Sequence, residues 1–129
     1  MFADAYQMTG DERYLVAAQR YTHKMMVDNM QTGNMTFLDN KHANTQVPKY
    51  LGYERLAQQN QANGTKYHTA AENFWTDVVD NRTVALGGNS VNEHFVQRSN
   101  CHHHITMTDG PESCNTNNML KLTEALFAG

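Results

Sequence analysis

The sequence is poor in the residues that cross-link, interrupt or anchor a small domain. Its 129 residues include only two cysteines, two prolines and one tryptophan. Two cysteines do not make a disulfide framework. No run of about 18 apolar residues is present, so no transmembrane helix is expected. The N-terminus lacks the basic and then apolar stretches of a signal peptide, and the sequence leaves the compartment unassigned.

The charge and hydropathy exclude two classes of partner. Ten Lys and Arg residues against thirteen Asp and Glu residues give a net charge of −3. This weakly acidic balance argues against a nucleic-acid-binding surface and against a polybasic membrane patch. The mean hydropathy of −0.69 is low for so short a chain, and small domains bury little of their surface. We therefore expect that residues outside this chain complete the hydrophobic core in which it takes part.

Apolar residues recur at helical spacing almost throughout, which predicts an all-α fold. Five helices are expected, at residues 2–8, 11–30, 41–59, 65–79 and 114–127. Thr9 and Gly10 end the first helix, Asp11 caps the second, and Pro48 lies in the first turn of the third or at a kink. Nothing before Phe2 caps the first helix, so we expect it to begin in missing sequence.

Between the last two helices lies a long irregular segment around 82–112, of a length that is usually functional or disordered. Two apolar faces are predicted in detail. The second helix should bury Leu15, Ala18, Tyr21 and Met25. The last should bury Met119, Leu122 and Leu126. Paired helices joined by short turns favour helical hairpins, arranged as a tetratricopeptide-like solenoid or as an α/α toroid, although no 34-residue period recurs.

Glu112 and Cys114 stand two residues apart where the last helix begins. A carboxylate and a thiolate at this spacing can bind one metal ion, and both are zinc ligands. The helix N-terminus also lowers the pKa of a thiol. The alternative is structural: Glu112 as a favourable first-turn acid and Cys114 as a small core residue.

The run Cys101-His102-His103-His104 is a second candidate metal tract. Alternate residues could supply two ligands at most. One hypothesis combines Cys101, one histidine, Glu112 and Cys114 into a self-contained tetrahedral site. The alternative is a histidine-rich loop with adventitious metal binding.

Two further residues have chemistry suited to a ligand. His42 stands among amide side chains at a predicted helix start, a setting suited to hydrogen-bonding sugar hydroxyls, or simply to helix capping. Glu93 follows a Gly-Gly turn in the irregular segment. Taken alone, it is typical of a solvated surface carboxylate.

Three blocks carry a resemblance to a known family. They are HANTQVPKYLGYERLA, FWTDVVDNRTVALGGNSVNEHF and GPESCNTNNMLKLTEALF, preceded by the helical hairpin FADAYQMTGDERYLVAAQRY. Together they resemble glycoside hydrolase family 127, the β-L-arabinofuranosidase relatives common in gut bacteria. The blocks GGNSVNEHF and GPESCNTNNMLKL are the most specific, and the resemblance spans essentially the whole chain.

The resemblance implies an (α/α)6 barrel of six helical hairpins. Members are several times longer, so residues 1–129 would be a partial catalytic domain, truncated at both ends. The family uses a zinc-bound cysteine thiolate as nucleophile, with one glutamate and three cysteines as ligands. Glu112 and Cys114 match two of those ligands, and the other two, the nucleophile included, would lie beyond Gly129. Glu93 matches the general acid/base and His42 a sugar-contacting histidine.

Three functional hypotheses follow. The first is a fragment of a retaining glycosidase that releases L-arabinose or a related furanose from a glycan, inactive by itself and with an incomplete zinc site. The second is a non-catalytic helical-repeat binding module. The third is a small domain with its own structural zinc. A truncated barrel would expose apolar helix faces, so self-association is also expected.

Overall fold

The computed structural model describes residues 2–59, 62–98 and 100–127, and this part of the chain is all-α. It contains seven α-helices and one 3-10 helix, η1. Their bounds are α1 Phe2–Thr9, α2 Glu12–Arg20, α3 Lys24–Gln31, η1 Met35–Leu38, α4 Ala43–Gln59, α5 Gly64–Arg82, α6 Cys101–Thr106 and α7 Ser113–Phe127. Within the described ranges there is no strand, and no helix is long and apolar enough to cross a membrane. The predicted all-α class is confirmed.

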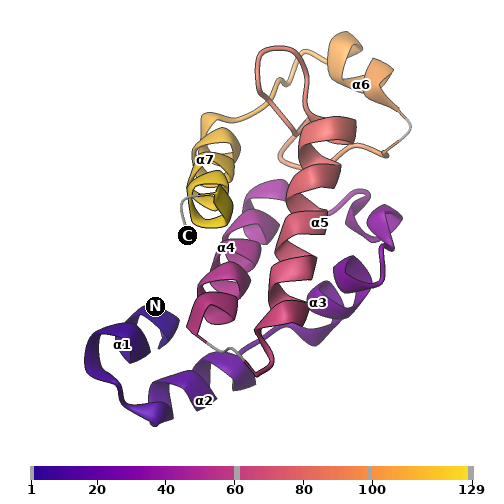
Figure 1. Cartoon of the computed structure of the whole chain (residues 1–129). Coiled ribbons are helices and arrows are strands. Elements are labelled where there is room, and N and C mark those ends of the chain that lie inside the picture. The colour runs from indigo at the N-terminus through magenta and orange to yellow at the C-terminus, as the bar shows by residue number, and fades with distance from the viewer. Residues whose placement is uncertain (1, 60–61, 99, 128–129) are drawn as a thin grey trace.

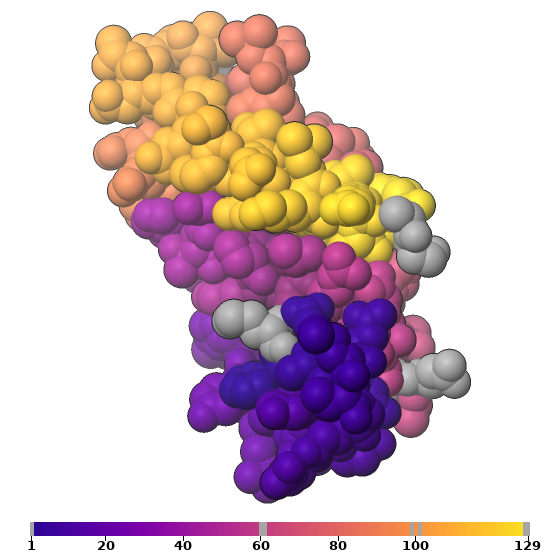
Figure 2. Space-filling model, turned by 90° about the vertical axis from the view of Figure 1, so that its left-hand side faces the viewer, coloured from indigo at the N-terminus to yellow at the C-terminus, as the bar shows by residue number. Residues whose placement is uncertain are grey.

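The helices pack as neighbouring hairpins around α4 and α5. These two long helices lie side by side, with α3 against α5 and α7 against α4 (Figure 1). The α1–α2 hairpin lies at the end of the molecule opposite α6, and α7 runs along α4 between them (Figure 2). The arrangement confirms the predicted helical hairpins.

An aromatic stack between α4 and α5 forms the centre of the core. The rings of Tyr50 and Phe74 are nearly parallel, with centroids 3.9 Å apart. Such a pair stabilises the fold by about 0.5–1.5 kcal/mol beyond the contribution of the apolar area that it buries. The Tyr50 hydroxyl donates to the carbonyl of Met26 on α3 at 3.2 Å. Trp75 Nε1 donates to Thr123 Oγ1 at 2.8 Å. Polar tips of core aromatics thereby fix α3 and α7 against the central pair.

The predicted helix over 11–30 is two helices. Its start is confirmed, because the Asp11 carboxylate accepts the backbone N–H of Arg13 at 3.0 Å. At the break the backbone N–H of Thr22 donates to the carbonyl of Gln19 at 3.3 Å. The Thr22 hydroxyl donates to the carbonyl of Ala18 at 3.2 Å, so this carbonyl keeps a partner where the helix ends.

The break changes which side chains of this region are buried. Tyr21 is 80% exposed and Met25 is 58% exposed, so the predicted apolar face is wrong in its second half. Leu15 and Ala18 do pack on the core. After the break, α3 buries Met26, Val27 and Met30 instead.

Two more boundaries differ from the sequence prediction. Of the two alternatives for Pro48, the first turn is wrong and a kink stays a prediction, because Pro48 lies in the second turn of α4. Its missing N–H cannot donate to the carbonyl four residues earlier. The segment around 82–112 is not wholly irregular, because it contains α6. The last helix buries Met119 and Leu122 as predicted.

A groove of about 660 Å³ lies between α1, α2, α4 and α7. Its walls include Tyr21, Leu51 and Leu56, and two further apolar side chains, Leu120 and Phe127, are exposed on α7. Large apolar patches often mark contact surfaces. The expected self-association of copies stays a prediction.

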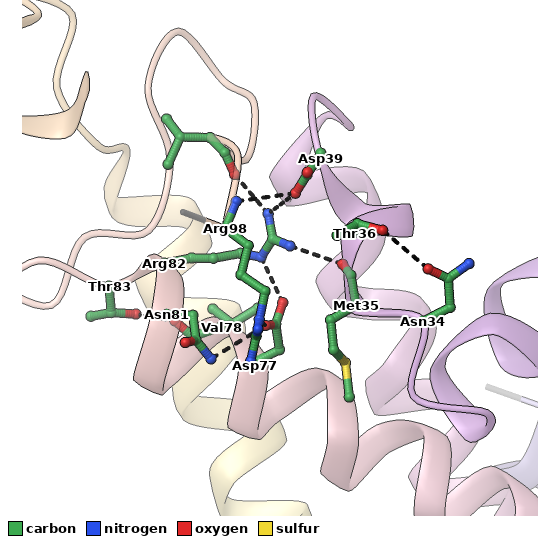
Figure 3. A network of polar contacts seen from close by, with 11 residues as sticks. Asn34, Met35, Thr36, Asp39, Asp77, Val78, Asn81, Arg82, Thr83 and Arg98 are labelled. Carbon is green, nitrogen blue, oxygen red and sulfur yellow. Dashed lines mark hydrogen bonds and ion pairs between the residues drawn. The ribbon is translucent and has the colours of Figure 1, made fainter. Parts of the chain in front are cut away.

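A buried guanidinium joins the end of α5 to the two loops that follow α3 and α5 (Figure 3). The Arg82 side chain is fully buried. Its Nε donates to Asp77 at 2.6 Å and its Nη1 to Asp39 at 2.8 Å. Nη1 also donates to the carbonyl of Val96 at 2.6 Å, and Nη2 to that of Met35 at 2.9 Å. One side chain therefore satisfies two carboxylates and two main-chain carbonyls.

Arg98 completes this network from the far side of the loop. Its Nε donates to the second oxygen of Asp77 at 2.7 Å, and its backbone N–H donates to Asp39 at 3.2 Å. Asp77 is itself buried, so two arginines balance its charge. The segment between Arg82 and Arg98, which contains Glu93, is thus fixed at both ends.

Replacing Arg82 should be strongly destabilising. In Arg82→Met the carboxylates of Asp77 and Asp39 lose a partner inside the protein, and breaking a buried ion pair costs about 3–5 kcal/mol. Chemical denaturation followed by circular dichroism measures the change. The control is Arg20→Met, at an exposed position on α2, which should stay within about 0.5 kcal/mol of the wild type. Equal losses of stability in the two variants would contradict the role of Arg82 as the buried partner of Asp77 and Asp39.

Candidate active site

Glu93 lies at the tip of a short hairpin whose turn has two residues. Val91 and His94 exchange both backbone hydrogen bonds, each 3.0 Å long. The two residues between them, Asn92 and Glu93, have φ values of 46° and 65°. Two consecutive left-handed residues are the pattern of a type I′ turn, for which Asn-Gly is the favoured sequence.

Glutamate in the second place of this turn is conformationally strained. Left-handed backbone costs a residue other than glycine about 1–3 kcal/mol, and such strain is found preferentially at functional sites. Asparagine tolerates the conformation, as at Asn92, but glutamate gains nothing from it. The turn does expose the Glu93 carboxylate, whose side chain is 55% accessible.

The hairpin is held against the chain that enters α4. The carbonyl of Glu93 accepts the N–H of Ala43, the first residue of α4, at 2.8 Å. Phe95 exchanges backbone bonds with this segment, donating to Lys41 at 2.9 Å and accepting from Asn40 at 3.0 Å. The Phe95 ring is fully buried. Glu93 therefore caps α4 with its main chain while its side chain faces outward.

This attachment brings together Glu93 and His42. His42 Nε2 lies 3.7 Å from Glu93 Oε2, and the rings of His42 and His94 meet edge to face with centroids 5.3 Å apart. Nδ1 of His42 is buried and has no hydrogen-bond partner among the described residues. Two residues 51 positions apart in the sequence thus form one polar surface at the start of α4.

Glu112 and Cys114 form a separate pair at the start of α7, and neither contacts Glu93 or His42 among the interactions of the described residues. The Cys114 Sγ lies 3.5 Å from Glu112 Oε2. Burial raises the pKa of the Cys114 thiol, and the neighbouring Glu112 carboxylate raises it further. The expectation of a lowered thiol pKa is therefore wrong here, because desolvation and a nearby negative charge outweigh the helix N-terminus.

The histidine tract takes no part in this pair. His102, His103 and His104 lie on the short helix α6. Among the described residues, no group of three or more His, Cys, Asp and Glu side chains converges on one point. The side chain of Cys101 lies outside the described part of the chain. The self-contained four-ligand site is therefore not assembled by the side chains that the structure describes.

Side chains on α7 contact both the loop that leads to Glu93 and the start of α4. Asn115 Nδ2 donates to Ser90 Oγ at 2.6 Å, and both residues are fully buried. Thr116 Oγ1 donates to the carbonyl of Gly87 at 3.2 Å, and Asn118 Nδ2 donates to Asn44 Oδ1 at 2.7 Å. The first two turns of α7 thus hold both the loop leading to Glu93 and the first turn of α4.

The loop also makes a close contact with the residues that precede α7. A Cβ added at Gly88 would overlap the ring of Pro111. Only glycine fits where the loop backbone crosses this ring. The contact joins Gly88 and Pro111, one from each of the two most specific sequence blocks.

The sequence indicates four candidate chemical residues but gives no sign of the side chains that position them. Asn115, Ser90 and Arg82 carry no pattern of their own in a single sequence. Their burial was the missing information: an asparagine within an amphipathic helix is typical of an exposed position. The strained conformation of Glu93 was equally invisible, since only its main-chain partners impose it.

Removing the Asn115 side chain should loosen the loop that carries Glu93. Asn115→Ala leaves the buried Ser90 hydroxyl without its partner, a loss of about 1–3 kcal/mol. Hydrogen exchange should become faster at the amides of Val91, His94 and Ala43, which depend on the hairpin. The control is Asn117→Ala, an exposed neighbour on the same helix. Unchanged exchange at these amides in Asn115→Ala would contradict the role of Asn115.

Comparison with known proteins identifies the family. The family model described as beta-L-arabinofuranosidase, GH127 catalytic domain, matches residues 1–129. No curated protein matches the chain. The match covers the hairpin with Glu93, the start of α4 and the start of α7, the three elements that form the site. The chain therefore belongs to the GH127 β-L-arabinofuranosidase family of glycoside hydrolases, and its hairpins are those of an (α/α)6-barrel catalytic domain.

Proposed function

We propose that this chain supplies the acid/base half of a retaining glycosidase that acts on L-arabinofuranosides or related furanosides. The observation that carries the proposal is the geometry of Glu93. Its carboxylate is exposed at the tip of a strained hairpin, 3.7 Å from His42. Family membership gives the class of reaction, and strain at a solvent-facing carboxylate is typical of a catalytic group.

Glu93 would act on the glycosidic oxygen. As a carboxylic acid it protonates the departing oxygen, and as a carboxylate it then takes a proton from the attacking water. The hairpin suits both steps, because its main chain is fixed to Ala43 and Phe95 while the carboxylate stays free to exchange protons.

His42 would orient the furanose ring beside that carboxylate. The imidazole is partly exposed, with 38% of its side chain accessible, and an accessible ring nitrogen can donate to or accept from a sugar hydroxyl. Its Nδ1 is buried, so Nε2, which lies 3.7 Å from Glu93 Oε2, is the atom that a sugar hydroxyl would contact.

The pair formed by Glu112 and Cys114 suits a zinc ion. A carboxylate oxygen and a sulfur 3.5 Å apart match the ligand types and the compact spacing of zinc sites. Bound zinc keeps a cysteine sulfur deprotonated near neutral pH. These residues supply two of four ligands, and we infer that the remaining ligands and the nucleophilic cysteine come from outside this chain, as do the other helices of the barrel.

Glu93→Gln should lower the rate most for substrates whose leaving group must be protonated as it departs. With a sugar leaving group, kcat/KM should fall about 10²–10⁴-fold, the usual contribution of general acid catalysis. With a 4-nitrophenyl leaving group the loss should be much smaller, since this anion departs without a proton. Kinetics on the complete protein that contains this chain, with L-arabinofuranosides of both kinds, measure the difference.

The matched control for this experiment is Glu72→Gln, an exposed glutamate on α5. It should leave both rates unchanged. Equal losses with both leaving groups in Glu93→Gln would remove Glu93 from the acid role. Full activity of that variant would favour a binding module or another catalytic residue.

Zinc content tests the metal pair separately. The complete protein should hold one zinc per chain by elemental analysis, and Cys114→Ser should lose it. Ser113→Ala, between the two ligands and exposed, should retain it. The 129-residue chain alone should hold close to none, because two ligands do not close a tetrahedral shell. One zinc per isolated chain would instead indicate a self-contained structural site.

A further inference from the structure

His94, the residue that follows Glu93 in the hairpin, lies against His42. His42 and His94 stand directly opposite each other in an isolated antiparallel bridge. The backbone hydrogen bonds of this bridge join their neighbours rather than the pair itself, and side chains come closest in antiparallel pairs of this kind. The two imidazole rings accordingly meet edge to face, with their centroids 5.3 Å apart. The register of the bridge therefore places a second ring against the histidine proposed to contact the sugar.

The same ring holds the backbone of the turn. His94 Nδ1 lies 2.6 Å from the carbonyl oxygen of Asn92. A carbonyl oxygen can only accept, so Nδ1 carries the proton and donates it to this bond. Among the described residues no backbone N–H donates to that carbonyl. The peptide group between Asn92 and Glu93 is therefore held by the side chain of His94.

This bond restrains Glu93 in its left-handed conformation. The peptide group that precedes Glu93 is the one that His94 holds, and the φ angle of Glu93 is 65°. The peptide group that follows Glu93 is held separately, because its carbonyl accepts the N–H of Ala43 at 2.8 Å. Glu93 is thus fixed from both sides. A left-handed residue other than glycine persists only where its surroundings fix the backbone in this way.

His94 makes both contacts from an exposed position. An exposed imidazole buries little apolar area, so it adds little to the hydrophobic core, and substitutions at such positions usually change the stability of a protein only slightly. A substitution of His94 should therefore change the geometry of Glu93 and His42 while the fold stays intact.

We propose that His94 is a positioning residue with two separate contacts. Its Nδ1–H fixes the backbone that presents the Glu93 carboxylate, and its ring edge fixes the imidazole of His42. The inference rests on the proposed function, since it takes Glu93 as the general acid and His42 as the residue that orients the furanose. It goes beyond that function because the two contacts act on different steps. The Nδ1 contact serves proton transfer to the leaving group, and the ring contact serves binding of the sugar.

Two substitutions separate these contacts. His94→Phe keeps a ring beside His42 and removes the donor, whereas His94→Asn removes the ring and keeps an N–H donor close to the place of Nδ1. The substrates are L-arabinofuranosides with a sugar or a 4-nitrophenyl leaving group, and the enzyme is the complete protein that contains this chain. His94→Phe should lose about tenfold in kcat/KM with the sugar leaving group, the factor that corresponds to one hydrogen bond. With 4-nitrophenyl, which departs without a proton, its kcat/KM should change little.

His94→Asn should show the opposite pattern. Because the donor to Asn92 is kept, the ratio of kcat/KM between the two substrates should stay that of the wild type. Because the ring is lost, KM should rise by the same factor for both substrates while kcat is unchanged. The matched control is His102→Phe, the same replacement at an exposed histidine on α6, which should leave both rates unchanged.

The outcomes distinguish this inference from the function on which it rests. Equal losses with both leaving groups in His94→Phe, the same selective loss in His94→Asn, or unchanged kinetics in both variants would overturn the role of His94 and leave Glu93 as the acid. If Glu93→Gln, measured in parallel, shows no selective loss with the sugar leaving group, the proposed function is overturned, and the role of His94 with it.

Discussion

The site depends on the burial of one positive charge. Arg82 is the last residue of α5, and its guanidinium holds Asp77 on its own helix, Asp39 before α4 and the carbonyl of Val96 beyond the hairpin. A buried charge of this kind is tolerable only when it is paired and hydrogen-bonded. The bonds from Arg82 to Asp39 and Val96 fix the loop that returns from α5 beside the start of α4, and Glu93 lies on that loop.

The chemistry is then assembled at helix N-termini by short polar contacts. The hairpin caps α4 through the carbonyl of Glu93, and α7 holds the preceding loop through Asn115 and the start of α4 through Asn118. These contacts fix main chains, while the side chain of Glu93 stays 55% exposed and that of His42 38% exposed. The strain at Glu93 is sustained because its neighbours over-determine the backbone.

Local rules explain what was predictable. The Asp11 cap, the stop at Gly10 and the burial of Met119 and Leu122 on α7 follow from interactions within a few residues, and the structure confirms them. The break before α3 is not predicted, although a local contact, the Thr22 hydroxyl on the carbonyl of Ala18, lies at it. It was missed because the apolar spacing continues across it, and spacing dominates such a prediction.

By itself, the sequence determined the helical class, most helix boundaries, the family resemblance and the four candidate residues Glu93, Glu112, Cys114 and His42. Spacing and residue type are sufficient for these because each is a local property. Only the tertiary structure decided that His42 faces Glu93, that the pKa of Cys114 is raised and that Arg82 is the buried anchor. Each of these depends on desolvation and on contacts between residues far apart in the chain, which no local pattern encodes.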